Sequence, residues 1–395
     1  MQKRDQILEC AAATFNQRGV RGATLADIAE SVGLNLTSIR HYFLKKEDLV
    51  AAAYLRSIES HAALIAKAKT AGPREARARD LVRRYFEFRR RIREGATPQV
   101  IIFGDLRSLT GVHAEQVWPG YVGLFRSVRE IVADPAEIDG DRQRVNARAH
   151  TLLWQCLRTV FWLPNYQVDD FDRVESRFID ILLNGLGAPG WTSRSRVAQL
   201  AESAPPDKRS RESFLMAATE LINEQGYRGA SVERIAARLN VTKGSFYHHI
   251  DAKADLVVEC FKRNLELLQE AQRNAIASEP LGLDQAFAAV AALVRRQQTP
   301  AGPLLRNSAL MSVKEDTRDD MLRQIDLIGA RFTDMVSDGI VDGSGRTCDA
   351  RIAGKMLMAQ INSAAQLRKF VPDVSADRSV DLYVKPLFNG LFAGA

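Results

Sequence analysis

The chain has 395 residues, too many for one ordinary hydrophobic core, and this length indicates two or more domains. Its hydrophobic content of 46% and charged content of 26% are typical of a globular protein. No apolar run approaches the ~18 residues that a membrane span requires, so we expect a cytoplasmic protein with no membrane contact. The net charge of +7 is compatible with a polyanionic partner but does not establish one.

The sequence lacks the patterns of metal sites and of common enzymes. Its four cysteines are far apart and include no CxxC pair, and no histidine cluster has zinc-site spacing. Glycine-rich phosphate loops, nucleophile elbows and HExxH sequences are also absent. We therefore expect free thiols, no metal, no cofactor and no enzymatic activity. The cysteines are Cys10, Cys156, Cys260 and Cys348.

A short sequence occurs twice, as GVRGATLADIAES at residues 19–31 and as GYRGASVERIAAR at residues 226–238. When Leu8–Val50 is aligned without a gap to Leu215–Val257, about a third of the positions are identical and most apolar positions coincide. The ends of the halves also match, as LLNGL (182–186) and LFNGL (387–391). The separation far exceeds the roughly 20–50 residues of solenoid repeats. We interpret the chain as one domain-sized unit present twice.

Apolar spacing and capping residues predict three short helices at the start of each copy. Gly19 and Gly226 stand where the first helix ends, and positive φ is expected there. Second helices are expected over 25–31 and 232–238, and third helices end near Phe43 and Ile250. The N-caps are Thr24, Asn35, Ser231 and Thr242. Such an arrangement is a helix-turn-helix, whose last helix fits the DNA major groove.

The exposed face of each third helix carries the candidate DNA contacts. Arg40 could bond a guanine edge, whereas Tyr42, Lys243, Tyr247 and His249 suit phosphates. The four N-caps belong to the same candidate surface, as do Lys46 and Lys253 at the start of the following helix. A solvated polar face remains the alternative for any one of these residues. The base-reading candidates are Leu36, Thr37, Arg40 and His41 in the first copy, and Lys243, Gly244, Tyr247 and His248 in the second.

Longer amphipathic helices follow each helix-turn-helix, and few stretches alternate with period two. We therefore expect an all-α protein. The expected helices are 46–69, 74–94, 99–108, 113–133, 142–163 and 170–186, then 253–277, 284–298, 303–312, 318–338, 348–370 and 378–392. The expected domains are 1–48 and 210–255 for the helix-turn-helix domains, 49–187 and 256–395 for the helical domains, and 188–209 for a Pro-, Ser- and Gly-rich linker.

The residues of both motifs carry a family resemblance. TKGSFYHHI (242–250), followed by Lys253 and Leu256, resembles the helix-turn-helix signature of the tetracycline-repressor (TetR) family, and so does NLTSIRHYF (35–43) with Lys46 and Leu49. The resemblance implies a DNA-binding domain and a helical ligand-binding and dimerisation domain in each half. The chain departs from the family pattern because members usually carry one unit and form homodimers. The first copy also has Thr37 and Arg40 where the family commonly has Gly and Tyr.

These features lead to a hypothesis of an internal pseudo-dimer on operator DNA, whose two heads read unlike half-sites. The resemblance implies that the last two helices of each half form a four-helix interface, and it favours repression that a small molecule relieves. Whether whole chains also form a homodimer stays open. The alternative is an interaction module in which only the second helix-turn-helix binds DNA and the first is structural.

Two aromatic stripes are candidates for an effector site. Aromatic residues with one cation would suit an amphipathic or anionic small molecule, and the alternative is ordinary core packing. The candidates are Trp118, Tyr121 and Phe125 on one helix, and Trp154, Arg158 and Trp162 on another.

Overall fold

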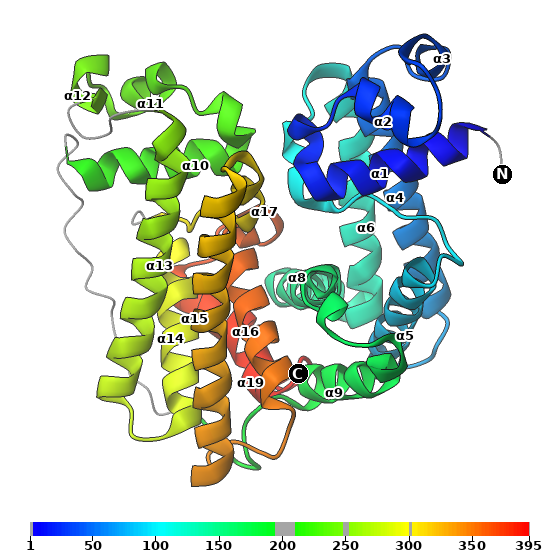
Figure 1. Ribbon diagram of the computed structural model, residues 1–395. Coiled ribbons are helices and arrows are strands. Elements are labelled where there is room, and N and C mark those ends of the chain that lie inside the picture. Colours follow the sequence, from blue (N-terminus) through cyan, green and yellow to red (C-terminus); the bar gives the residue numbers. More distant parts are fainter. Residues whose placement is uncertain (1–2, 194–209, 248–252, 300–301, 395) are drawn as a thin grey trace.

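The structure is a computed structural model that describes residues 3–193, 210–247, 253–299 and 302–394. Within these ranges the chain consists of helices and turns, and the only strand-like pairing is one bridge between Gly187 and Gly345. The expected all-α fold of two tandem units is confirmed. The two halves lie side by side, with the first in blue to green and the second in green to red (Figure 1).

The described part of the first half contains nine α-helices. The first head comprises α1–α3, and α4–α9 form the bundle behind it. The bounds are α1 Lys3–Gly22, α2 Leu25–Ser31, α3 Leu36–Arg40, α4 Lys46–Ala68, α5 Arg74–Arg93, α6 Gly111–Val132, α7 Pro135–Gly140, α8 Arg142–Arg158 and α9 Phe171–Asn184. Four 3-10 turns join them: η1 Phe103–Ser108, η2 Thr159–Phe161, η3 Leu163–Asn165 and η4 Val168–Asp170.

The second half repeats this order. The second head comprises α10–α12, and its bundle follows. The bounds are α10 Arg211–Gly229, α11 Val232–Leu239, α12 Lys243–Tyr247, α13 Lys253–Ser278, α14 Gly282–Gln297, η5 Asn307–Ser312, α15 Glu315–Asp342, α16 Ala350–Ala364, α17 Leu367–Phe370, α18 Ala376–Ser379, the π-turn η6 Val380–Val384 and α19 Lys385–Asn389.

Several expected helices differ from those observed. The segments 99–108 and 303–312 contain only the 3-10 turns η1 and η5, because the preceding backbone bonds to asparagine side chains. The last expected helix is divided, since Pro386 has no N–H to donate and η6 adopts π geometry just before it. Helix α7 lies between two expected helices, in a segment for which the sequence predicted none, although Asp134 and Glu137 form a capping box at its start.

The two heads differ in the hydrophobic core to which they belong. The main core runs through both bundles and includes Ile28 and Ile39 of the first head. The second head has a separate core with the start of α13, in which Ile235 and Phe261 are buried. Ile325, partly buried on α15, packs against both cores. The first head is therefore continuous with the bundles, whereas the second is packed as a distinct unit.

Helices α8 and α9 pack against α16, α17, η6 and α19 of the second half. At the centre of this interface Gln155 Nε2 donates to the carbonyl of Met356 at 3.0 Å and to Gln360 Oε1 at 2.9 Å. Both glutamines are buried. Buried amide groups require hydrogen-bond partners, and here the two glutamines find them in the opposite half of the chain.

The repeated Asn-Gly sequences at the ends of the halves contact each other. The amides of Leu186 and Gly187 donate to the Phe388 carbonyl at 2.8 Å, and the Leu391 amide donates to the Leu182 carbonyl at 2.9 Å. A Cβ built on Gly185 would lie 2.5 Å from the Gly390 nitrogen and closer still to the Phe388 oxygen. Glycine is therefore required where these backbones cross.

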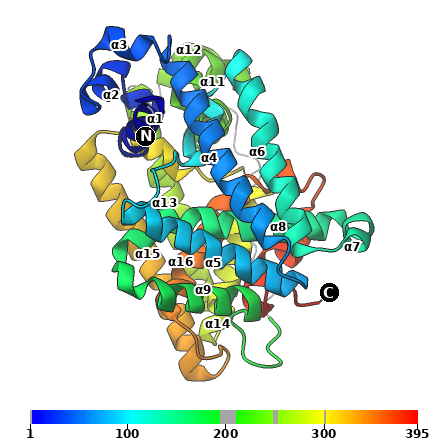
Figure 2. The same ribbon diagram turned by 90° about the vertical axis from the view of Figure 1, so that its right-hand side faces the viewer.

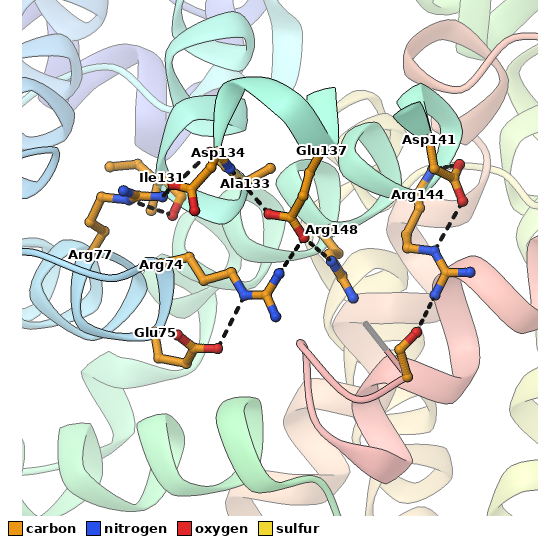
Figure 3. Close-up of polar contacts among 11 residues, drawn as sticks. Arg74, Glu75, Arg77, Ile131, Ala133, Asp134, Glu137, Asp141, Arg144 and Arg148 are labelled. Carbon is orange, nitrogen blue, oxygen red and sulfur yellow. Dashed lines mark hydrogen bonds and ion pairs between the residues drawn. The ribbon is translucent and has the colours of Figure 1, made fainter. Parts of the chain in front are cut away.

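Arginines of the first half, several of them in ion pairs that join α5, α7 and α8 (Figure 3), also contact the last described residues. Arg74 of α5 pairs with Glu137 of α7, and Arg148 of α8 lies 3.9 Å from the same carboxylate. The guanidinium groups of Arg74 and Arg148 also lie over the Phe392 ring, at 5.1 and 5.7 Å from its centre. Arg144 donates to the Gly394 carbonyl at 2.7 Å. Residues 392–394 of the second half thus lie against α5 and α8.

The start of the expected linker 188–209 is packed. The Ala188 amide donates to the Ser344 carbonyl at 3.0 Å, and Trp191 stacks on Phe388 with ring centres 5.7 Å apart. Trp191 Nε1 also donates to Asp284 Oδ1 at 3.1 Å. Residues 194–209 lie outside the described residues.

The glycine crossing predicts a strong effect of Gly185→Ala on stability. Gly185 and Gly190 both have positive φ, but a Cβ on Gly190 would meet nothing within 4 Å. We expect Gly190→Ala to lower the free energy of unfolding by about 1 kcal/mol through backbone strain. Gly185→Ala should cost at least about 2 kcal/mol more, because it adds a clash with the other half. Urea unfolding checks this, and equal losses would contradict a close-packed crossing.

Candidate nucleic-acid interface

The first head is shaped by a glycine bend and two capped helices. Gly19 has φ 71°, so the chain turns there as expected. The Thr24 hydroxyl accepts from the Asp27 amide at 3.1 Å, and the Thr24 amide donates to the Asp27 carboxylate at 2.8 Å. Hydrogen bonds from Thr24, with a smaller contribution from Arg18, lower the pKa of Asp27. Asn35 caps α3 by accepting from the Ser38 amide at 2.8 Å.

Helix α3 separates a buried face from a polar exposed one. Ile39 is fully buried, and Phe43 is buried beyond the end of the helix. The helix ends at Arg40, earlier than the expected Phe43. The candidate residues Leu36, Thr37, Arg40, His41 and Tyr42 are all exposed.

Lys46 has a structural role that its sequence position did not indicate. Its ammonium donates to the carbonyls of Val20 at 3.0 Å and Ala23 at 3.1 Å. These bonds tie the start of α4 to the bend between α1 and α2. The Lys46 side chain therefore fixes the head on its bundle.

The second head repeats the construction with different surface chemistry. Gly226 has φ 71°, and Ser231 caps α11 by accepting from the Arg234 amide at 3.3 Å. Thr242 accepts from the Ser245 amide at 3.4 Å. Lys243 and Gly244 are exposed, and the Lys243 ammonium lies 2.6 Å from Glu233 Oε1. The hydrogen bond from Lys243 is the main reason that the pKa of Glu233 falls to about 2.

Four candidates of the second head lie outside the described part of the chain, either entirely or in their side chains. His248 and His249 lie outside the described residues. Tyr247 ends α12 and Lys253 begins α13, but their side chains also lie outside the described part.

Helices α3 and α12 lie at the same end of the molecule, at the top of Figure 1 and of Figure 2. The two bundles occupy the other end. The exposed faces of the two heads are therefore available on one side of a single chain.

Two asparagines that the sequence analysis missed clamp the heads to the bundles. Asn16 of α1 donates to the Val100 carbonyl and accepts from the Ile102 amide, both at 2.9 Å. Asn223, the residue of α10 that aligns with Asn16 in the repeat, bonds the backbone of 304–306 in the same way, at 2.9 and 3.1 Å. An identical polar residue stands at this position in both copies, among the apolar residues of the first helix of each head. This identity is the feature of the sequence that indicates a shared structural contact.

The six effector candidates separate into two groups. Trp154 and Arg158 line a cavity together with residues of α4, α5 and the segment 100–104. The other four, Trp118, Tyr121, Phe125 and Trp162, are not among its lining residues. Instead, Trp118 and Tyr121 pack edge to face at 5.7 Å, Phe125 contacts Phe370 of the second half at 4.4 Å, and Trp162 packs on Phe178 at 6.2 Å.

Comparison with known families identifies both heads. The model of the family described as "Bacterial regulatory proteins, tetR family" matches the chain twice, at residues 7–53 and 214–260. The matches include most of α1 and α10 and all of α2, α3, α11 and α12. No helix in the described part of the chain is long and apolar enough to cross a membrane.

Two curated relatives match over short segments. The transposon Tn10 TetC protein of Escherichia coli is 36% identical over 61 residues, which are 15% of this chain and 31% of the relative. The HTH-type transcriptional repressor KstR2 of Mycobacterium tuberculosis is 44% identical over 48 residues, which are 12% of this chain and 24% of the relative. The chain thus matches less than a third of the length of either relative.

Two solved structures align with slightly less than half of this chain. The TetR family transcriptional regulator PfmR from Thermus thermophilus is 22% identical, with a TM-score of 0.38, and the alignment covers 45% of this chain and 98% of that one. Apo AibR is 20% identical, also with a TM-score of 0.38, and the alignment covers 46% of this chain and 99% of that one.

The capping geometry distinguishes two threonines of the first head. Thr24→Ala removes the capping box of α2 and should lower the free energy of unfolding by about 1 kcal/mol. Thr37→Ala changes an exposed side chain for which the described residues provide no hydrogen bond, so it should stay within about 0.5 kcal/mol of the parent. Urea unfolding of both variants compares them directly. Equal stability of the two would show that the Thr24 cap contributes nothing.

Proposed function

Since the chain belongs to the tetR family of bacterial regulatory proteins and contains its N-terminal domain twice, we propose that it is a DNA-binding transcriptional regulator carrying both heads of a dimer in one polypeptide. The observation that carries this proposal is the position of α3 and α12 at one end of the molecule, each on a capped helix-turn-helix. A dimeric helix-turn-helix protein contacts half-sites about one helical turn, or ~34–36 Å, apart.

The junction of the halves supports an internal pseudo-dimer. In a twofold interface a patch contacts its own equivalent. Here Gln155 contacts Gln360, and the Gly185 sequence contacts the Gly390 sequence. Matched segments of one chain thus take the roles that two identical chains would play in a homodimer.

The differences between the heads support recognition of two unlike half-sites. The first head exposes Leu36, Thr37 and Arg40, and the second exposes Lys243 and Gly244. Arg40 is suited to a guanine edge, which it would bind through two hydrogen bonds. Lys243 is a phosphate ligand that must first exchange its ion pair with Glu233 for DNA. His41 and Tyr42 extend the surface of the first head.

Regulation by a small molecule completes the proposal. The curated relative KstR2 is named as a transcriptional repressor, and we propose repression for this chain as well. An effector must bind the DNA-competent and DNA-incompetent arrangements with different affinity, and such coupling is typically about 1–3 kcal/mol. Repression relieved by the effector is the expected direction.

Stoichiometry and footprinting test the two-headed arrangement. A duplex selected from a random pool should bind one chain, as measured by light scattering, and should show two protected half-sites of different sequence about one turn apart. Two chains on such a duplex would contradict the internal pseudo-dimer. Protection of one half-site would instead favour an interaction module in which only the second head binds DNA.

Arg40→Ala tests base recognition by the first head. Loss of one bidentate guanine contact costs about 1–3 kcal/mol, so affinity should fall roughly 5- to 150-fold and selectivity should relax in one half-site only. Arg331→Ala is the matched control because Arg331 is exposed on α15, in the bundle rather than in a head. Electrophoretic mobility shifts at fixed salt measure both variants. Equal affinity of the two variants would remove Arg40 from the recognition surface.

A further inference from the structure

A cavity lies where the two halves meet. Its volume is about 640 Å³, including space open to solvent. The first half contributes residues of α4, α5, α8 and the segment 100–104, and the second half contributes Arg306 and Gln366. The cavity therefore depends on both halves of the chain.

Three arginines line this cavity: Arg89, Arg158 and Arg306. The described residues that line it include no aspartate or glutamate. Its two other titratable lining residues are uncharged at neutral pH. Burial lowers the pKa of His61 to about 4 and raises that of Tyr85 to about 12. The described lining thus provides no carboxylate to pair with Arg89 or Arg158.

Arg158 packs on two aromatic rings. Its guanidinium lies 5.8 Å from the ring centre of Trp154 and 5.3 Å from that of Phe161. Its Nε is buried without a hydrogen-bond partner, and no acidic residue of the described chain forms an ion pair with it. Burial lowers its pKa to about 10, which still leaves it charged at neutral pH. A cation that is partly withdrawn from water without an ion pair is costly, and a bound anion would offset that cost.

We propose that this cavity binds one anionic small molecule with an apolar or aromatic body per chain, its acidic group held by Arg89 and Arg158 and its body packed on Trp154 and Phe103. The inference deepens the proposed function by naming the chemical class and the place of the effector. Arginine suits carboxylate, sulfonate and phosphate groups because its N–H donors can bind two oxygens at once.

The second half cannot supply an equivalent site. The contacts between Gln155 and Gln360, and between Gly185 and Gly390, set the register of the two units. In that register Ala359 takes the place of Trp154, and Ser363 takes the place of Arg158. The second copy thus lacks both the cation and the ring that packs on it. We therefore expect one ligand per chain, whereas a symmetric dimer of two identical units would bind two ligands.

The cavity wall is bonded to both heads. Asn16 of α1 holds the segment 100–102, and Asn223 of α10 holds 304–306, which ends at the cavity residue Arg306. A ligand that displaces these segments acts on the first helix of each head. A ligand at this single site can therefore influence the position of both heads.

Two fluorescent probes that share a ring system test the charge requirement. 8-Anilino-1-naphthalenesulfonate carries a sulfonate, and N-phenyl-1-naphthylamine lacks it. Both are titrated into the full chain without DNA, so failure of the DNA-binding proposal does not affect the result. We expect one sulfonate probe per chain and an affinity at least tenfold above that of the neutral probe. Equal affinities, or two equivalent sites per chain, would overturn the proposal.

Variants assign the site. Arg158→Gln and Arg89→Gln should each weaken the sulfonate probe about tenfold and change the neutral probe less than threefold. Arg91→Gln is the control, because Arg91 is exposed on the same helix as Arg89 and does not line the cavity. Circular dichroism verifies folding, and Arg89→Gln decides the outcome if Arg158→Gln does not fold. Equal effects of the Arg89 and Arg91 variants would overturn the proposal.

Amide hydrogen exchange tests the link to the heads. With the sulfonate probe bound, exchange should slow in both 100–104 and 304–306. A change in the first segment alone would show that the second half takes no part in the site.

Discussion

The arrangement of this protein depends on a backbone crossing that leaves no space for a side chain. The ends of α9 and α19 meet at Gly185 and Gly390, and carbonyls of each half lie where a Cβ of the other would stand. The hydrogen bonds from Leu186 and Gly187 to Phe388 follow from this approach. Buried contacts between Gln155 and Gln360 continue the interface along α8 and α16. Together these contacts fix the orientation of one bundle relative to the other.

Because the junction between the bundles is fixed, the contacts between each head and its bundle determine where the heads lie. Asn16 and Asn223 hold the first helix of each head to a backbone segment of its own bundle, and Lys46 ties the first head to α4. The two heads nevertheless differ in packing. The first shares the main core, whereas the second has a separate core of its own. The second head is therefore the part whose packing depends least on the junction.

Duplication within one chain allows its halves to diverge in ways that identical subunits cannot. Equivalent positions retain the contacts that build the pseudo-twofold, such as Gln155 with Gln360. Neighbouring positions of the same helices differ, so that Trp154 and Arg158 are matched by Ala359 and Ser363. The result is a symmetric framework with an asymmetric cavity and two chemically different heads.

The sequence by itself determined most of the helices, the duplication and the two helix-turn-helix motifs, because apolar spacing, caps and glycine bends are local properties of a chain. It also identified Trp154 and Arg158 as a pair on one helix face. Only the tertiary structure decided that they line a cavity with Arg89 and Arg306, while Phe125 packs on Phe370 instead. The partners of Asn16 and Lys46 likewise came only from the tertiary structure, because each bond joins residues far apart in sequence. Such pairings depend on how the bundles pack, and a periodic pattern contains no information about distance between helices.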